Sequence, residues 1–140
     1  MNKLHILVCG GRHFTNYTVL CDILDNVIGD IKEIEIVSGH CQGADMLGEK
    51  YAQERDITVK IFPADWAKYG RKAGPIRNKQ MIDYIKNFGN RLVVAFTNEN
   101  TVGTKNTITL AKKAKIPVME IPYVPSFKNN GVLGDFRKRR

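Results

Sequence analysis

The feature that most constrains the fold is a regular alternation of short apolar runs with longer amphipathic segments. The apolar runs cover residues 4–9, 34–37, 57–62, 92–96 and 116–121. The first run is apolar at nearly every position, which is typical of a strand buried on both faces of a parallel sheet. The alternation predicts an α/β fold: a Rossmann-like three-layer sandwich with a mostly parallel sheet of about five strands joined by right-handed crossovers.

Four helices are expected between these strands. The first has a possible cap at residues 15–16 and a clean helical stripe of apolar side chains, and the second covers residues 44–55. A long connection, residues 63–74, precedes a third helix with Pro75 at its first position, where a missing N–H costs nothing. Thr104 is the expected cap of the fourth helix.

Length and charge suggest one domain with a basic extension. The chain has 140 residues and a net charge of +8, which suits one hydrophobic core. We assign residues 1–122 to the domain and 123–140 to an irregular tail. The tail has five basic side chains and one acidic side chain, Asp135. The tail is either a solvated end or a tether for nucleic acid.

Location and metal content are predicted from what the sequence lacks. No apolar run approaches the roughly 18 residues that span a bilayer, and the first apolar run ends in Gly10-Gly11-Arg12 rather than in a signal-peptide cleavage site. The three cysteines form no C-x-x-C pair, which favours reduced thiols. We expect a cytoplasmic protein with no membrane contact, no metal site and no resident cofactor.

Unusual residues cluster where the predicted strands end, and ligands of open parallel sheets bind outside those ends. Glycines there allow close backbone approach, and the first N–H groups of a helix attract anions. The residues predicted to bind a phosphate-bearing ligand are Gly10, Gly11, Arg12, Ser38, Gly39, Gly43, Ala44, Asp45, Arg77, Asn78, Gly103 and Thr104.

Each of these signals has a structural alternative. The segment Gly39 to Gly43 is a phosphate cradle or an ordinary tight turn; it matches neither the Walker A nor the Gly-x-Gly-x-x-Gly pattern. Arg77 grips an anion or forms a surface salt bridge. Asp45 binds ribose hydroxyls or favours the helix dipole. Trp66 and Tyr69 stack on a base or pack a long loop onto the core.

Taken together, the motifs resemble the YspA-related branch of the SLOG superfamily. The ordered set is Gly10-Gly11-Arg12-x-Phe14, Ser38-Gly39-x-x-x-Gly43-Ala44-Asp45, Phe62-Pro63-Ala64-Asp65-Trp66, Ala73-Gly74-Pro75-x-Arg77-Asn78-x-x-Met81 and Gly103-Thr104. The resemblance covers residues 4 to 122. It implies a Rossmann-like domain that binds nucleotides or their derivatives, in a family often tied to phages, plasmids and bacterial conflict systems.

A distant relative implied by the same resemblance is the LOG phosphoribohydrolase, which cleaves the base from a nucleoside monophosphate. Arg77 and Met81 match its Arg and Met, but Thr107 stands where its catalytic Glu would be. A carboxylate stabilises the cationic transition state of N-glycoside cleavage. The carboxylates that could replace this Glu are Asp45, Asp65 and Glu99, and the sequence does not decide among them.

These observations lead to one expected function and two alternatives. We expect a binding or sensor domain for an ADP-ribose-like, NAD-like or nucleoside phosphate ligand, with a homodimer expected only by analogy. The first alternative is a hydrolase that cleaves the N-glycosidic bond of such a ligand. The second is a nucleic-acid-binding protein that uses the basic tail.

Overall fold

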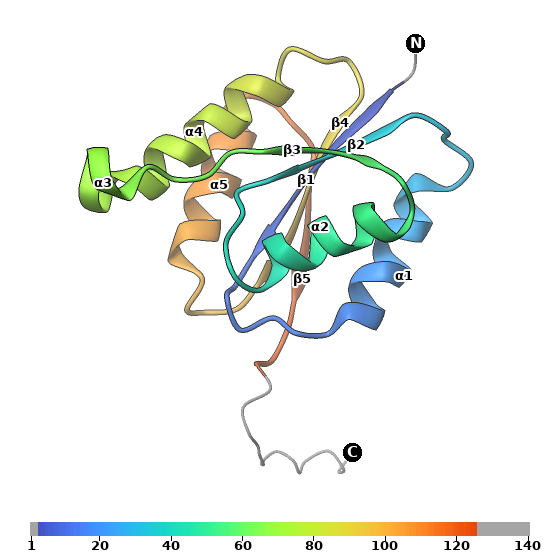
Figure 1. The fold of residues 1–140 in the computed structure, drawn as a ribbon, viewed down its shortest axis with the longest axis horizontal. Helices are drawn as coiled ribbons and strands as arrows, with labels where there is room; N and C mark the ends of the chain where they lie inside the picture. The colour runs from blue at the N-terminus through green and yellow to red at the C-terminus, as the bar shows by residue number, and fades with distance from the viewer. Residues whose placement is uncertain (1–2, 126–140) are drawn as a thin grey trace.

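The computed structural model of the chain describes residues 3–125, and Figure 1 shows their arrangement. One sheet of five parallel strands has the order β3-β2-β1-β4-β5, which confirms the predicted Rossmann-like sandwich. The strands are β1 (Leu4–Gly10), β2 (Ile34–Ser38), β3 (Thr58–Ile61), β4 (Arg91–Thr97) and β5 (Val118–Pro122). The expected tail begins at residue 123, and its positions 126–140 lie outside the described residues.

Helices cover both faces of the sheet (Figure 1). Helices α1 and α2 pack on one face, and α4 and α5 pack on the other. Along β1, Ile6 and Val8 point to the first face and Leu7 and Cys9 to the second, as the period of two in a strand requires. The helices are α1 (Tyr17–Ile28), α2 (Ala44–Glu54), α3 (Trp66–Tyr69), the 3-10 helix η1 (Gly70–Lys72), α4 (Ala73–Ile85) and α5 (Val102–Lys113).

The connection expected at residues 63–74 is partly helical. Asp65 caps α3 by accepting a hydrogen bond from the Lys68 amide at 3.1 Å. Helix α4 then begins at Ala73, two residues before the expected start. Pro75 still lies in the first turn, where its missing N–H leaves no intrahelical bond unmade.

The prediction that Thr104 caps the last helix is wrong, because α5 begins one turn earlier. Its N-cap is Thr101, whose carbonyl accepts the first helical bond from the Lys105 amide. The Thr101 hydroxyl also donates to the Asn98 carbonyl at 2.8 Å and accepts from the Asn98 amide at 3.2 Å. This turn fixes Thr101 at the helix entrance and leaves Thr104 inside the first turn.

The strand order identifies the edge of the sheet at which a ligand would be expected to bind. The chain runs outward from β1 through β2 to β3, then returns to pair β4 with the other side of β1. The crevice between β1 and β4 is thus the switch point at which parallel sheets of this kind bind ligands. Among residues 3–125, no helix is both long and apolar enough to cross a membrane.

Candidate functional site

Two glycine-bearing turns meet at the carboxyl ends of β1 and β2. The Ala44 amide, at the start of α2, donates to the Gly11 carbonyl at 3.3 Å. Gly43 has φ = +93°, and a Cβ there would overlap the Gly11 carbonyl and lie 2.6 Å from Arg12 Cα. Only glycine permits this contact without strain. The first turn is thus docked directly against the N-terminus of α2.

Arg77 of α4 reaches under the turn that follows β2. Arg77 is only 8% exposed. Its Nη1 donates to the Gly39 carbonyl at 2.5 Å and to Cys41 Sγ at 3.5 Å, and its Nε donates to Asn78 Oδ1 at 2.9 Å. Among the residues that the structure describes, none accepts a hydrogen bond from Nη2 and none forms an ion pair with Arg77. The surface salt bridge that the sequence left open is therefore not formed.

Asp45, in the first turn of α2, is buried beside the same glycine. Its Oδ2 accepts from the Cys41 amide at 3.3 Å. Burial raises the pKa of this carboxyl to about 7, against the opposing effects of the Cys41 amide and the Arg77 charge. A Cβ on Gly39 would lie 2.8 Å from Arg77 Nη1 and 2.9 Å from Asp45 Oδ2. The missing side chain of Gly39 allows the Arg77 and Asp45 side chains to approach this turn closely.

Glu49 is a further polar residue that contacts the same turn, and sequence reasoning missed it. Glu49 accepts a hydrogen bond from the Ser38 hydroxyl at 2.7 Å and lies 2.9 Å from His40 Nδ1. The His40 amide donates to Ser38 Oγ, and His40 has φ = +61°. The signal available in the sequence was the spacing of Glu49, four residues after Asp45 on one helix face.

Asn78 links α4 to α5. Its Nδ2 donates to the Gly103 carbonyl at 3.3 Å and to Asn106 Oδ1 at 3.0 Å, while its Oδ1 receives Arg77 Nε. Asn78 therefore orients the guanidinium and brings the first turn of α5 to the cluster. Thr104 in that turn is buried, and a Cβ on Gly103 would meet no atom within 4 Å.

The structure thus joins most of the predicted residues through direct contacts, in two adjoining groups. One contains Ser38, Gly39, Asp45, Arg77, Asn78 and Gly103; the other contains Gly10, Gly11, Arg12, Gly43 and Ala44. Glu99 is exposed, and its only described contact is from Lys105 Nζ to its carbonyl. Trp66 is 57% exposed. In residues 3–125, no group of three or more metal-ligating side chains comes together.

Comparison with known proteins shows a family match and a phage relative. Residues 4–69 match the family described as YspA, cpYpsA-related SLOG family. The chain is also 32% identical to the "Gene 61 protein" of Mycobacterium phage D29 over 120 residues, which is 81% of this chain and 93% of that protein. The match to the family includes both glycine-bearing turns and the first turn of α2.

Proposed function

This chain belongs to the YspA, cpYpsA-related SLOG family, and we propose on that premise that it binds a nucleotide or nucleotide-derived ligand at the carboxyl end of its sheet. ADP-ribose-like, NAD-like and nucleoside phosphate ligands share the groups that the site would recognise. These groups are an anionic phosphate and a polar ribose. The phage relative fits a role in phage biology or bacterial conflict.

The observation that carries the proposal is that Arg77 is buried while one of its nitrogens has no hydrogen-bond acceptor among the described residues. Arg77 is 8% exposed as a residue, burying a charged side chain is costly, and its Nη2 has no acceptor in the described part of the chain. Arginine suits phosphate because its planar fork can donate two parallel hydrogen bonds. A phosphate oxygen of the ligand would supply the acceptor that the protein does not.

Backbone amides beside Arg77 support the same assignment. In the turn before α2, the His40 and Cys41 amides donate to Ser38 Oγ and Asp45 Oδ2. The next two amides, of Gln42 and Gly43, donate to no acceptor among the described residues. They stand at the positive end of the α2 dipole, where N–H groups bind anions well.

Asp45 would form hydrogen bonds with the hydroxyl groups of the ribose. With a pKa of about 7, its carboxyl is largely protonated in mildly acidic solution and can then donate as well as accept a hydrogen bond. This raised pKa is also the observation that favours the second candidate function, N-glycosidic hydrolysis, because a general acid needs a pKa near the working pH. In that reading Asp45, rather than the exposed Glu99, is the catalytic carboxyl.

Calorimetry with ADP-ribose, NAD, AMP and ADP tests the proposal. Arg77→Ala removes a charge-assisted contact of about 1.5–3 kcal/mol, so affinity is expected to fall by roughly 10- to 150-fold. Arg71→Ala, on the exposed surface of η1, is the matched control and is expected to bind normally. Arg77→Lys keeps the charge in case the alanine variant unfolds.

Two results would contradict the proposal. One is that none of the four compounds binds the wild-type protein at millimolar concentration. The other is that a compound binds with equal affinity to wild type and to folded Arg77 variants, which would place its site elsewhere. Release of adenine from AMP or of nicotinamide from NAD, lost in Asp45→Asn, would establish the second candidate function.

A further inference from the structure

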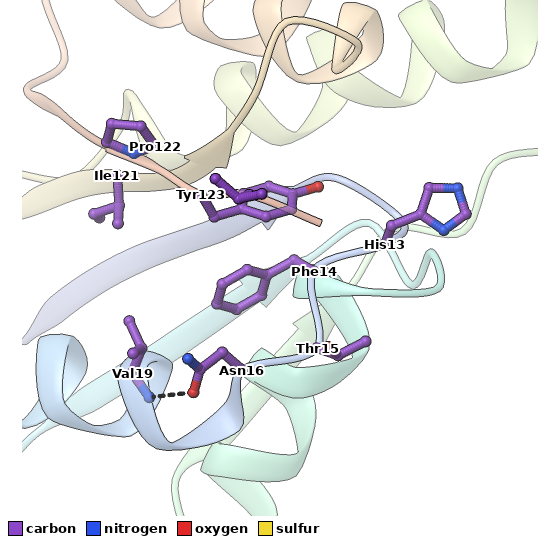
Figure 2. A pocket seen from close by; sticks show the side chains of 9 residues that line it. His13, Phe14, Thr15, Asn16, Val19, Ile121, Pro122 and Tyr123 are labelled. Carbon is purple, nitrogen blue, oxygen red and sulfur yellow. Dashed lines mark hydrogen bonds between the residues drawn. The ribbon is translucent and has the colours of Figure 1, made fainter. Parts of the chain in front are cut away.

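The structure contains a pocket of about 290 Å³ (Figure 2). Three segments line it: residues 13–16 of the β1–α1 loop, Val19 of α1, and residues 121–124 at the end of β5. Its volume falls just below the ~300–1,000 Å³ that is typical of small-molecule sites. The pocket therefore suits one ring system rather than a whole dinucleotide.

Aromatic rings form the inner wall of this pocket. Phe14 is 2% exposed and stacks on Phe96, with ring centroids 4.3 Å apart. Tyr123 meets the Phe14 ring edge-on, at 5.1 Å and 73°. Figure 2 shows the Tyr123 ring on one side of Phe14 and the Asn16 side chain on the other. Since Phe14 is fixed in the core, it also fixes the position of the Tyr123 ring.

Polar groups of the pocket have hydrogen-bonding capacity to spare. Asn16 Oδ1 caps α1 by accepting from the Val19 amide at 3.1 Å, which fixes the orientation of the amide group. No acceptor for Asn16 Nδ2 lies among the described residues, and the same holds for the Tyr123 hydroxyl. An aromatic wall with directed polar groups suits a flat heteroaromatic ring that carries its own donors and acceptors.

Gly11 connects this pocket to the phosphate site. On one side its carbonyl receives the Ala44 amide at the start of α2. On the other side, a Cβ at Gly11 would overlap the Tyr123 hydroxyl and lie 2.8 Å from Thr101 Cγ2. The thickness of one glycine backbone thus separates Tyr123 from the N-terminus of α2. Tyr123 and the start of α2 therefore contact opposite sides of the same buried turn.

We propose that this pocket binds the nucleobase of the ligand and that Tyr123 determines which base is accepted. The assignment rests on the proposed function for the phosphate end, and adds the place of the base. The base would pack against the Tyr123 ring, with Asn16 Nδ2 donating to its edge. Its ribose and phosphate would extend from the pocket toward the α2 amides and Arg77.

NMR of the full chain with labelled Val and Ile methyl groups and labelled backbone amides tests the pocket directly. The probes are adenosine, guanosine, cytidine and uridine, which carry a base without phosphate, and ribose 5-phosphate, which carries phosphate without a base. At least one nucleoside is expected to shift the Val19 and Ile121 methyl signals in a saturable way. Ribose 5-phosphate is expected to shift the Gln42 and Gly43 amides and to leave those methyl signals in place.

Variants separate the pocket from the rest of the site. Val19→Trp fills the pocket and is expected to weaken nucleoside binding at least tenfold while leaving ribose 5-phosphate unaffected. Asn26→Trp, at an exposed position of the same helix, is the control and should change neither. Tyr123→Ala is the second variant if Val19→Trp unfolds, and it is expected to reduce the differences in affinity among the four nucleosides.

The outcomes distinguish this inference from the proposed function. If ribose 5-phosphate binds but no nucleoside shifts the Val19 and Ile121 signals, the base pocket is wrong and the phosphate site stands. If a nucleoside binds in the pocket but ribose 5-phosphate shifts neither the Gln42 nor the Gly43 amide, the proposed phosphate site is wrong and the base pocket is supported. Nucleoside binding that both pocket variants leave unchanged would also overturn the inference.

Discussion

Replacing Asp45 by Asn tests the electrostatics of the site without changing its shape. The amide oxygen of Asn can still accept the hydrogen bond from the Cys41 amide, which Asp45 Oδ2 receives at 3.3 Å. The variant removes only the charge that the carboxyl gains on ionisation. Because Asp45 is 5% exposed, this charge has lost nearly all contact with water in the folded protein, and burial disfavours the ionised form.

The magnitude follows from the two pKa values. The carboxyl has a pKa of 3.8 in the unfolded chain and about 7 in the folded protein. Below pH 3.8 it is protonated in both states and costs nothing. Between pH about 4 and about 7 the unfolded chain loses this proton first, so the free energy of unfolding falls as pH rises. The total fall is about 4 kcal/mol, at 1.36 kcal/mol for each pKa unit.

Urea denaturation of wild type and Asp45→Asn from pH 5 to pH 8 measures this effect. We expect the wild-type free energy of unfolding to fall by about 3 kcal/mol more than that of the variant over this range. Asp83→Asn is the control. Hydrogen bonds from Lys79 and Lys86 lower the pKa of Asp83, so its contribution is lost only at acidic pH and the profile from pH 5 to pH 8 should not change. Identical pH profiles for wild type and Asp45→Asn would refute the buried state of this carboxyl.

Two further predictions concern the turn after β2 and the tail. Gly39→Ala places a Cβ 2.8 Å from Arg77 Nη1 and is expected to lower the free energy of unfolding by about 1–3 kcal/mol. Gly103→Ala, with open space at the Cβ, should be neutral or stabilising by up to about 1 kcal/mol; equal urea midpoints for the two variants would contradict this. Deletion of residues 137–140 is expected to weaken any salt-dependent binding of DNA or RNA in gel shifts. Nucleotide affinity, measured by calorimetry, is expected to stay unchanged. Loss of nucleotide binding in the truncated protein would refute the separation of tail and core.

The fold could be predicted from the sequence because its signals are periodic and local. The apolar run in β1 requires burial on both faces, and Asn16 caps α1 as its type and position suggested. The start of α5 could not be predicted in the same way. Both Thr101 and Thr104 are suitable caps, and the choice depends on the hydrogen bonds between Thr101 and Asn98, which residue types alone do not specify.

The sequence grouped the candidate residues at one sheet edge, but it did not predict the contacts between them. Sequence placed Gly39, Asp45 and Arg77 at one sheet edge, but the partner of Arg77 Nη1 is a backbone carbonyl 38 positions away along the chain. Tyr123 lies in the range expected for the tail. Only the pairing of β5 with β4 brings its hydroxyl to Gly11, and no local pattern of residues encodes that pairing.

The partners of Arg77 explain how the site can hold a positive charge ready for an anion. Its Nε and Nη1 donate to an amide oxygen of Asn78 and to the carbonyl of Gly39, which are neutral acceptors. An ion pair with Asp45 would position the guanidinium equally well but would cancel its charge. Instead, the raised pKa of Asp45 leaves that carboxyl largely uncharged below pH 7. A buried guanidinium held in this way stabilises the fold little, and its charge supports the proposal that a phosphate of the ligand completes the site.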